Sequence, residues 1–195
     1  MHDLQLHRAG PRDRPVLDRL WLTFRHDMAE HRPVLPFPDG TYRDERLRAA
    51  LTRPDHDAWL LLLDDRPAGL AVTRAPHDGP QVLSSYFVVR GARRLGLGRR
   101  GVHALTSQHP GAWEVAYQAA NAPAAAFWPR IAAEIDPLGW HQQDRTVPAR
   151  PELPPDTWVT FTAHRTSTTS TTSSSPASSD VATTSTRRWT SAGDR

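Results

Sequence analysis

The 195-residue sequence contains neither cysteine nor lysine, and it has no hydrophobic run long enough to span a membrane. Without cysteine, the chain can form no disulfide bond, no thiolate metal site and no cysteine nucleophile. A membrane-spanning helix needs about 20 predominantly apolar residues, and residues 1–13 lack the apolar segment of a signal peptide. These absences predict a cytoplasmic protein that has no membrane partner.

Apart from histidine, every basic residue is an arginine. The formal net charge is +3, and the isoelectric point is near 10.1. A chain this rich in arginine forms basic clusters by chance, so such clusters are weak signs of nucleic-acid binding. The sequence also shows neither the aromatic platforms nor the motifs of nucleic-acid binders. We therefore expect no nucleic-acid partner. The dense arginine cluster over residues 90–100 favours a local phosphate site instead.

The composition of the chain changes abruptly at Thr166, after which serine, threonine and alanine dominate. Few residues in this segment can form a core, so it is expected to stay disordered. The preceding residues are enough to bury about two-thirds of the surface of the unfolded chain. The sequence therefore predicts one folded domain over residues 1–165 and a disordered tail over residues 166–195.

Hydrophobic periodicity and turn residues predict a domain of the α+β class with a largely antiparallel sheet. One parallel step is expected at the glycine-rich segment near residue 96. Strands are expected at residues 3–7, 58–63, 68–73, 82–89, 113–117, 139–146 and 158–162, and helices from the Asp13 cap to Met28, over 43–52, from the glycine-rich segment to the Pro110–Gly111 stop, and over 121–134. Pro129 lies inside the last helix, where it removes a backbone hydrogen bond, so we expect a kink or a break near Phe127.

The stretch from Val82 to Gly101 combines an apolar strand, a loop with three glycines and the start of a helix. The glycines allow the backbone of the loop to approach a ligand closely. The helix N-terminus then offers unpaired N–H groups and a partial positive charge. Arg99 and Arg100 oppose that charge, and a bound phosphate or pyrophosphate would make them favourable. The pattern therefore predicts an anion site at this loop.

Gly96, Gly98 and Gly101 also match the G-x-G-x-x-G spacing of dinucleotide-binding proteins. That fingerprint requires a strand running directly into the first glycine and an acidic residue at the end of the next strand. Here residues 90–95 intervene, and Glu114 lies inside the next strand rather than at its end. No series of further βαβ units follows. We therefore reject the dinucleotide interpretation.

Two motifs resemble those of the GNAT acyltransferase family. The segment Arg93–Gly98 (RRLGLG) matches the family's acetyl-CoA signature R/Q-x-x-G-x-G/A, and it follows a strand as that family requires. The segment Asn121–Trp128 (NAPAAAFW) resembles the family's N-x-x-A-x-x-L/F-Y/W helix, which follows another strand. Two motifs in the right order and spacing are far more specific than one. The resemblance implies a mixed, mostly antiparallel sheet flanked by helices.

The resemblance also implies acetyl-CoA as the acyl donor. The strand backbone would hold its pantetheine arm, an amide near Val88 would polarise the thioester carbonyl, and the loop N–H groups would bind its pyrophosphate. Asn121 resembles the asparagine that contacts the cofactor arm, although it is also an ordinary helix N-cap. The implied cofactor-binding residues are Phe87, Val88, Val89, Arg94, Leu95, Gly96, Leu97, Gly98, Arg99 and Asn121.

The sequence departs from the family pattern at three places. Arg90 stands where proline is frequent, and Trp128 replaces the frequent tyrosine acid, whose proton an indole cannot supply. Ser84, Ser85 and Tyr86 occupy the strand region where many relatives carry an acidic residue. These departures weaken the expectation of catalysis more than the expectation of cofactor binding.

Three residues remain as candidates for proton transfer, namely Tyr117, Glu114 and Tyr86, with His77 or solvent as a relay. Tyr117 is preferred, because the resemblance implies that the acetyl group lies between the two splayed strands that carry these residues. Each of them also has an ordinary structural interpretation. The histidines show no zinc-type spacing, so we predict no metal site.

Two functions remain open from the sequence. The first is an acetyl-CoA-dependent N-acetyltransferase that acts on a small-molecule amine or a protein amino group by direct transfer. The second is a catalytically weak GNAT-fold module that binds acyl-CoA or regulates another protein. The proline-rich loop over residues 31–42 either faces the acceptor or is a simple connector, and a homodimer is left open.

Overall fold

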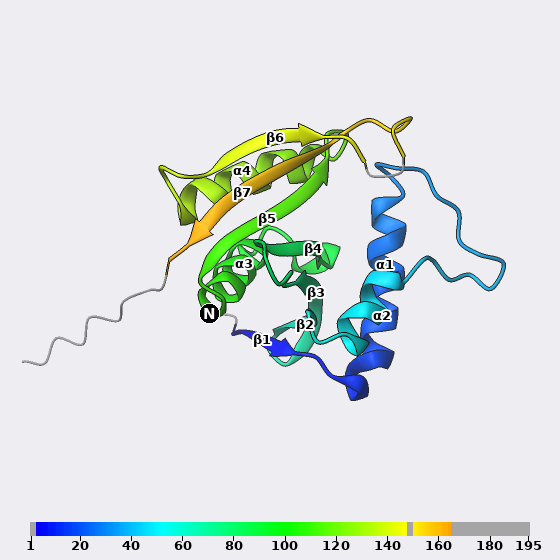
Figure 1. Cartoon of the computed structure of the whole chain (residues 1–195). Coiled ribbons are helices and arrows are strands. Elements are labelled where there is room, and N and C mark those ends of the chain that lie inside the picture. Colours follow the sequence, from blue (N-terminus) through cyan, green and yellow to red (C-terminus); the bar gives the residue numbers. More distant parts are fainter. Residues whose placement is uncertain (1–2, 148–149, 165–195) are drawn as a thin grey trace, which may run out of the picture.

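A computed structural model describes residues 3–147 and 150–164 of the chain (Figure 1). The tail predicted over residues 166–195 lies outside the described residues. The strands are β1 (Leu4–Arg8), β2 (His56–Leu63), β3 (Arg66–Arg74), β4 (Gln81–Val88), β5 (Gly111–Gln118), β6 (His141–Arg145) and β7 (Asp156–Ala163), and the helices are α1 (Arg14–Met28), α2 (Glu45–Thr52), α3 (Leu97–Gln108) and α4 (Ala122–Ile135). These elements follow the order that the sequence predicts. In the described part of the chain, no helix is long and apolar enough to cross a membrane.

The strands form one mixed sheet in the order β1-β2-β3-β4-β5-β7-β6. All neighbouring strands are antiparallel except β4 and β5, which run parallel. The parallel contact is short, because only Gln81–Leu83 pair with Trp113–Val115. Beyond these residues the two strands no longer pair, and the second half of β4 has a free edge. The predicted α+β class and the single parallel step are therefore confirmed.

An irregularity in β4 lies where the strand leaves β5. Its partner β3 pairs Thr73 with Leu83 and Val72 with Ser85, so Ser84 has no opposite residue. One extra residue of this kind is a β-bulge, which bends its strand and increases the local twist. The bulge therefore accompanies the separation of β4 from β5.

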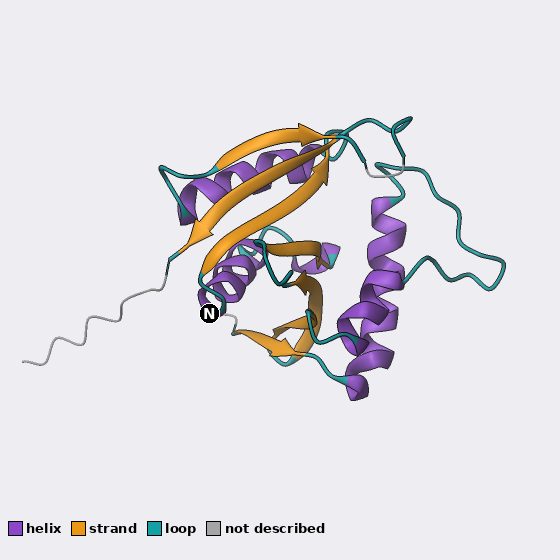
Figure 2. Ribbon diagram, in the orientation of Figure 1, coloured by secondary structure: helices purple, strands orange, loops and turns teal. Residues whose placement is uncertain are grey.

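Helices cover both sides of the sheet, as Figure 2 shows. Helices α1 and α2 pack on β2, β3 and β4, and α3 and α4 pack on the other side. The first core contains Leu17, Leu20, Trp21, Phe24, Leu47, Leu60, Leu70, Val72 and Phe87. The second contains Trp59, Leu61, Leu83, Val102, Leu105, Trp113, Val115, Trp128, Ile131, Val159 and Phe161. The β4 strand thus contributes to both cores, and its free edge lies between them.

The predicted break near Phe127 is wrong, because α4 runs unbroken from Ala122 to Ile135 with Pro129 inside it. An interior proline costs about 3 kcal/mol or more through its lost hydrogen bond and its steric clash. Burial of the large side chains of Trp128 and Ile131 opposes this cost, at about 1.5–3 kcal/mol for each fully buried apolar side chain. Tertiary packing therefore preserves the helix that local rules predict to break.

The end of α4 is also fixed to the sheet by a buried carboxylate. Asp136 follows the helix, and its Oδ1 and Oδ2 accept hydrogen bonds from the N–H groups of Gly139 (2.9 Å) and Thr162 (2.8 Å). Because Thr162 belongs to β7, this contact joins the helix end to a strand distant in sequence.

Gly101 in α3 allows the helix to lie directly against β4. A methyl group at this position would overlap the hydroxyl oxygen of Tyr86 and would lie 2.8 Å from Leu61 Cδ2. The Tyr86 ring cannot easily yield, since it is stacked on Phe127 and meets the edge of Trp128. The position therefore requires glycine for packing.

We predict that Gly101→Ala destabilises the fold, although alanine ordinarily favours a helix interior over glycine by about 1 kcal/mol. Overpacking of a core contact costs about 1–3 kcal/mol, so we expect a net loss of about 1 kcal/mol in unfolding free energy. Urea denaturation measures it, with Gly91→Ala as the control, because a methyl group there meets nothing within 4 Å. Equal or greater stability of Gly101→Ala would contradict the close packing.

Candidate functional site

A cavity with a volume of about 830 Å³ lies along the edge of β4 that β5 has left. Its walls come from the end of α1, the second half of β4, the loop before α3 and the start of α4. Small-molecule and cofactor sites commonly have volumes of about 300–1,000 Å³. The cavity is therefore large enough for an extended organic ligand, and helices from both sides of the sheet line it.

The N-terminus of α3 forms one end of this cavity. Gly96 precedes the helix in a left-handed conformation with a φ of 72°, and Gly96, Leu97 and Gly98 line the wall. The N–H group of Arg100 donates to the Gly96 carbonyl (3.0 Å). Within the described chain, the N–H groups of residues 94–99 have no acceptor, as is usual in the first turn of a helix. These N–H groups lie at the loop where the sequence predicts an anion site.

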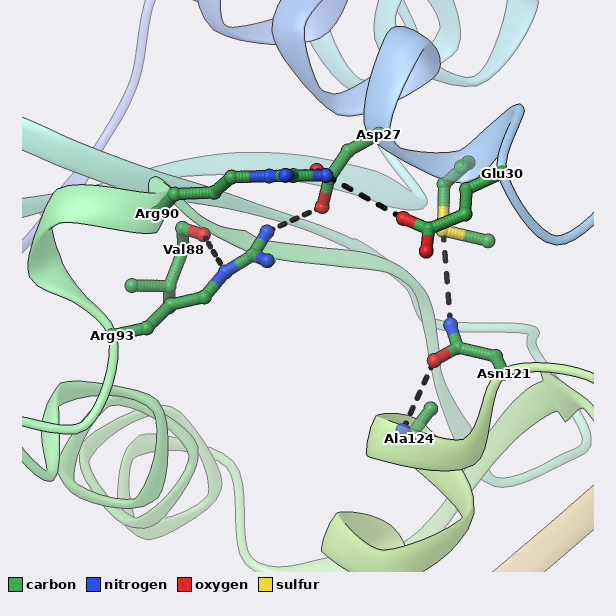
Figure 3. Close-up of polar contacts among 8 residues, drawn as sticks. Asp27, Glu30, Val88, Arg90, Arg93, Asn121 and Ala124 are labelled. Atoms are coloured by element: carbon green, nitrogen blue, oxygen red, sulfur yellow. Dashed lines mark hydrogen bonds and ion pairs between the residues drawn. The ribbon is translucent and has the colours of Figure 1, made fainter.

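Two arginines of the predicted phosphate cluster are held by carboxylates instead (Figure 3). Arg93 donates through Nε to the Val88 carbonyl (2.9 Å) and through Nη2 to Asp27. Arg90 donates through Nε to the same Asp27 carboxylate (2.8 Å) and lies 3.5 Å from Glu30. These contacts join the end of α1 to the loop that carries the anion site.

The Asp27 carboxylate is mostly buried, with 19% of its side chain exposed. Burial raises its pKa, but hydrogen bonds from Arg93 and Arg90 and their positive charges outweigh burial and hold the pKa below its ordinary value. Asp27 therefore stays ionised and keeps both guanidinium groups in place.

Arg99 and Arg94 differ in whether another side chain holds their guanidinium group. Arg99 donates through Nε to Glu134 (2.6 Å), which also lies 3.2 Å from His103. Arg94 lines the cavity, is exposed, and has no hydrogen bond or ion pair with any described residue. Of these loop arginines, Arg94 is thus the free cation beside the unpaired N–H groups.

The β4 edge supplies one further unpaired donor. The N–H group of Val89, just after β4, donates to the carbonyl of Ala68 in β3 (2.9 Å). Because successive residues of a strand direct their backbone groups to opposite sides, the N–H and C=O groups of Val88 face away from β3, toward the opening. Arg93 occupies the Val88 carbonyl, which leaves the Val88 N–H group open.

Asn121 caps α4 and also forms part of the cavity wall. Its Oδ1 accepts a hydrogen bond from the Ala124 N–H group (3.1 Å), and its Nδ2 lies 4.0 Å from Met28 Sδ (Figure 3). The N-cap interpretation is confirmed, and the position in the wall agrees with the implied contact to a cofactor arm.

Most of the predicted cofactor residues come together in this cavity, which is lined by Phe87, Val88, Arg94, Gly96, Leu97, Gly98, Arg99 and Asn121. Val89 and Leu95 do not line it. The Val89 side chain packs with the α1 core, and half of the Leu95 side chain is exposed to solvent.

The three candidates for proton transfer are placed differently. Tyr86 lines the cavity, and its hydroxyl donates to the Gly98 carbonyl (2.7 Å). Burial raises the pKa of Tyr86, so its phenol stays protonated. Trp128, which stands in place of the family's tyrosine, packs against the Tyr86 ring with centroids 5.7 Å apart.

Glu114 and Tyr117 lie on β5 and do not line the cavity. Glu114 accepts a hydrogen bond from Arg145 Nη2 (2.8 Å) and is 15% exposed. Tyr117 faces the opposite side of the sheet, where its ring packs on the α4 core. Its hydroxyl has no partner among the described residues. Tyr117 follows the last pair between β4 and β5, so it belongs to the separated part of β5.

Sequence reasoning missed the contribution of α1 to the site. Asp27, Met28 and Glu30 line the cavity, and no motif marks them. The signal that could have found Asp27 is the arginine excess at residues 90–94, which has no acidic residue nearby in the sequence to balance it. Over the described ranges, no three potential metal-binding side chains of His, Cys, Asp or Glu gather.

The chain is similar to several solved acetyltransferase structures. One is an acetyltransferase from Thermus thermophilus, and the match spans 83% of this chain and 99% of that protein (21% identity, TM-score 0.60). Another is the ribosomal-protein-S18-alanine N-acetyltransferase from Escherichia coli, where the match spans 85% of this chain and 98% of that protein (14% identity, TM-score 0.57). A third is an aminoglycoside acetyltransferase in complex with coenzyme A, where the match spans 82% of this chain and 95% of that protein (16% identity, TM-score 0.59). These likenesses show the fold.

No curated protein matches the chain in sequence. A model of the acetyltransferase (GNAT) family matches residues 19–132, which is more than half of the chain and includes the whole anion loop and most of α4. Because the family model matches more than half of the chain, including the loop with the acetyl-CoA signature, the chain belongs to the acetyltransferase (GNAT) family and uses acetyl-CoA as its acyl donor.

Proposed function

We propose that this protein transfers the acetyl group of acetyl-CoA directly to the amine of an acceptor. Such a reaction needs a held thioester, stabilisation of the oxyanion, and proton transfer from the amine and to the departing thiolate. The observation that carries the proposal is the cavity along the β4 edge, since unpaired N–H groups lie at its α3 end and at Val88. The donor supplies the activated acyl group, and the chain supplies the binding and polarising groups.

The unpaired backbone groups have distinct roles in this proposal. The N–H groups of residues 94–99 bind the pyrophosphate, and Arg94 adds a positive charge beside them. Phe87 and Val88 lie along the pantetheine arm, and Asn121 contacts it from the start of α4. The Val88 N–H group donates to the thioester oxygen, which gains negative charge when the amine attacks. The new C–N bond forms as the C–S bond breaks, and the thiolate leaves.

Tyr117 remains the proposed proton donor for the thiolate, with solvent as the relay because Tyr117 does not line the cavity. Its hydroxyl has no partner among the described residues, whereas the Tyr86 hydroxyl is engaged with Gly98 and the Glu114 carboxylate with Arg145. Glu114 lies on the α1 and α2 side of β5, so we propose that it accepts the amine proton through water. Tyr86 is retained as the third candidate, because it alone of the three lines the cavity.

A second candidate function is a GNAT-fold module that binds acyl-CoA without efficient turnover. Trp128 in place of the family's tyrosine and the occupied hydroxyl of Tyr86 favour it. Acetyl-CoA raises the melting temperature under both proposals, because a ligand that binds only the folded state stabilises it. Thiol release with a panel of amines distinguishes them, since only an N-acetyltransferase releases coenzyme A when an amine is added.

The acceptor is proposed to be a small-molecule amine or a protein amino group. Both kinds occur in the names of the structural neighbours, an aminoglycoside acetyltransferase and a ribosomal-protein-alanine N-acetyltransferase. The cytoplasmic location, the lack of a nucleic-acid or membrane partner and a homodimer remain predictions.

We predict that Gly98→Val weakens acetyl-CoA binding by about tenfold or more, equivalent to about 1.4 kcal/mol. A Cβ at residue 98 lies 3.5 Å from the Phe127 ring and 4.0 Å from a Val88 methyl group. The two further methyl groups of valine therefore fill the cavity between α3, β4 and α4. Calorimetric titration with acetyl-CoA measures the affinity.

Gly10→Val is the matched control for this substitution. Gly10 has an extended backbone with φ −117° and ψ −172°, and a Cβ there meets nothing within 4 Å. This variant should bind acetyl-CoA like the unchanged protein. If Gly98→Val bound equally well while folded, the donor would lie elsewhere.

We predict that Tyr117→Phe lowers kcat by about 10²-fold or more, because general acid catalysis contributes about 10²–10⁴-fold. The affinity for acetyl-CoA should stay within about twofold, since Tyr117 does not line the cavity. Steady-state thiol release and calorimetric titration measure the two quantities. An unchanged kcat would remove Tyr117 from the mechanism and leave Tyr86 or solvent as the proton source.

A further inference from the structure

Four arginine side chains gather on the α1 and α2 side of the sheet, apart from the donor site. Arg25 and Arg32 belong to the end of α1 and the loop after it, Arg46 to α2, and Arg74 to the end of β3. The pKa of Arg46 is lowered, first by its partial burial and then by the positive charge of Arg25. Arg74 and Arg32 add to this effect, and attraction to Asp156 opposes it, so Arg46 lies close enough to the other three guanidinium groups to be repelled by them. We call these four residues the arginine cluster.

Arg46 lies where β4 separates from β5. Its Nη1 donates to the Ser84 carbonyl (2.8 Å), and Ser84 directly follows Leu83, the last β4 residue that pairs with β5. Among the described residues, Arg46 makes no other hydrogen bond or ion pair, and its side chain remains exposed. Four of its five N–H donors are therefore left without a protein partner at the start of the opening.

Arg25 shows a second unsatisfied group. Its Nε is buried and has no hydrogen-bond partner among the described residues. Burial lowers the pKa of Arg25, and attraction to Glu45 opposes that effect. A buried donor without a partner is unfavourable, and an anion would satisfy it only if the Arg25 side chain turned toward the ligand.

The four arginines do not line the cavity themselves, but two of them follow residues that line its α1 end. Phe24 and His31 line the cavity wall, and they are the chain neighbours of Arg25 and Arg32. Arg46 reaches the same region through Ser84, two residues before Tyr86 in the wall. The cluster therefore lies where an acceptor would meet a thioester held along β4.

The carboxylates in this region do not balance the cluster. Asp156 forms an ion pair with Arg32 (3.0 Å). Glu114 forms one with Arg145 instead (2.8 Å). Glu45 attracts Arg25, but no hydrogen bond joins them in the described chain. Asp156 also attracts Arg46, but among the described residues neither Arg46 nor Arg74 forms an ion pair.

Building on the proposed N-acetyltransferase function, we propose that the acceptor is a small amine that also carries a carboxylate or phosphate group, which Arg46 binds with Arg25. A guanidinium group can donate two parallel hydrogen bonds to either anion, and such charge-assisted bonds are about twice as strong as neutral ones. The anion relieves the repulsion within the arginine cluster. The amine of the same molecule is then directed toward the β4 opening.

Matched acceptor pairs that differ in one anionic group test this proposal. The pairs are β-alanine with β-alaninamide and O-phosphoethanolamine with ethanolamine, assayed for thiol release with saturating acetyl-CoA. We expect the anionic member of at least one pair to have a kcat/KM about tenfold higher or more. In Arg46→Gln this advantage should fall to about threefold or less through a higher KM, while the neutral members change little.

Two variants control for charge and for folding. Arg12→Gln removes a positive charge before the start of α1, thirteen residues from Arg25, and should keep the preference for the anionic acceptor. Arg46→Lys keeps the charge at the site and should keep part of that preference. If Arg46→Gln does not fold, Arg25→Gln replaces it, with the same loss of preference expected.

Binding to the protein saturated with coenzyme A separates this inference from the proposed function. If amines are acetylated without regard to their anionic group, the inference is wrong and the N-acetyltransferase function stands. If no amine is acetylated, but the anionic members alone raise the melting temperature of the coenzyme A complex, the inference holds and the enzyme proposal fails. If the anionic members are not acetylated and do not raise the melting temperature of the coenzyme A complex, the inference is overturned.

Discussion

The parallel contact between β4 and β5 shapes the site because it ends after three residue pairs. Backbone groups that lose a strand partner must bind another group or remain open to solvent and ligand. Val88 shows both outcomes, because its carbonyl accepts a hydrogen bond from Arg93 and its N–H group stays open. At Val88 the edge of β4 therefore presents a donor rather than an acceptor, which suits a ligand with a carbonyl oxygen.

The position of the loop beside this edge depends on a carboxylate from the far side of the sheet. Asp27 receives hydrogen bonds from Arg90 and Arg93 and is mostly buried. Removing one partner from a buried ion pair is more destabilising than replacing the whole pair, because the remaining charge is left without compensation. Two arginines that resemble phosphate ligands in the sequence thus fix the loop, and the backbone N–H groups remain as the proposed ligands of the anion.

The sequence predicted the elements whose signals are local. Alternating apolar residues indicate the strands, and the spacing of glycines at residues 96 and 98 indicates the anion loop. The Asp27 contacts could not be predicted, because they join residues 63 and 66 positions apart and leave no periodic pattern. The break at Pro129 was predicted from a local rule that the burial of α4 overrides. The separation of β4 from β5 was expected only through the family resemblance.

The arginine cluster has a chemical consequence for a protein of this family. A guanidinium group keeps its proton at physiological pH, and its delocalised nitrogens are poor nucleophiles, unlike the amine of lysine. The cluster therefore places positive charge near the opening without providing a competing acetyl acceptor. Because the chain has no lysine, none of its side chains offers an alkyl amine for self-acetylation.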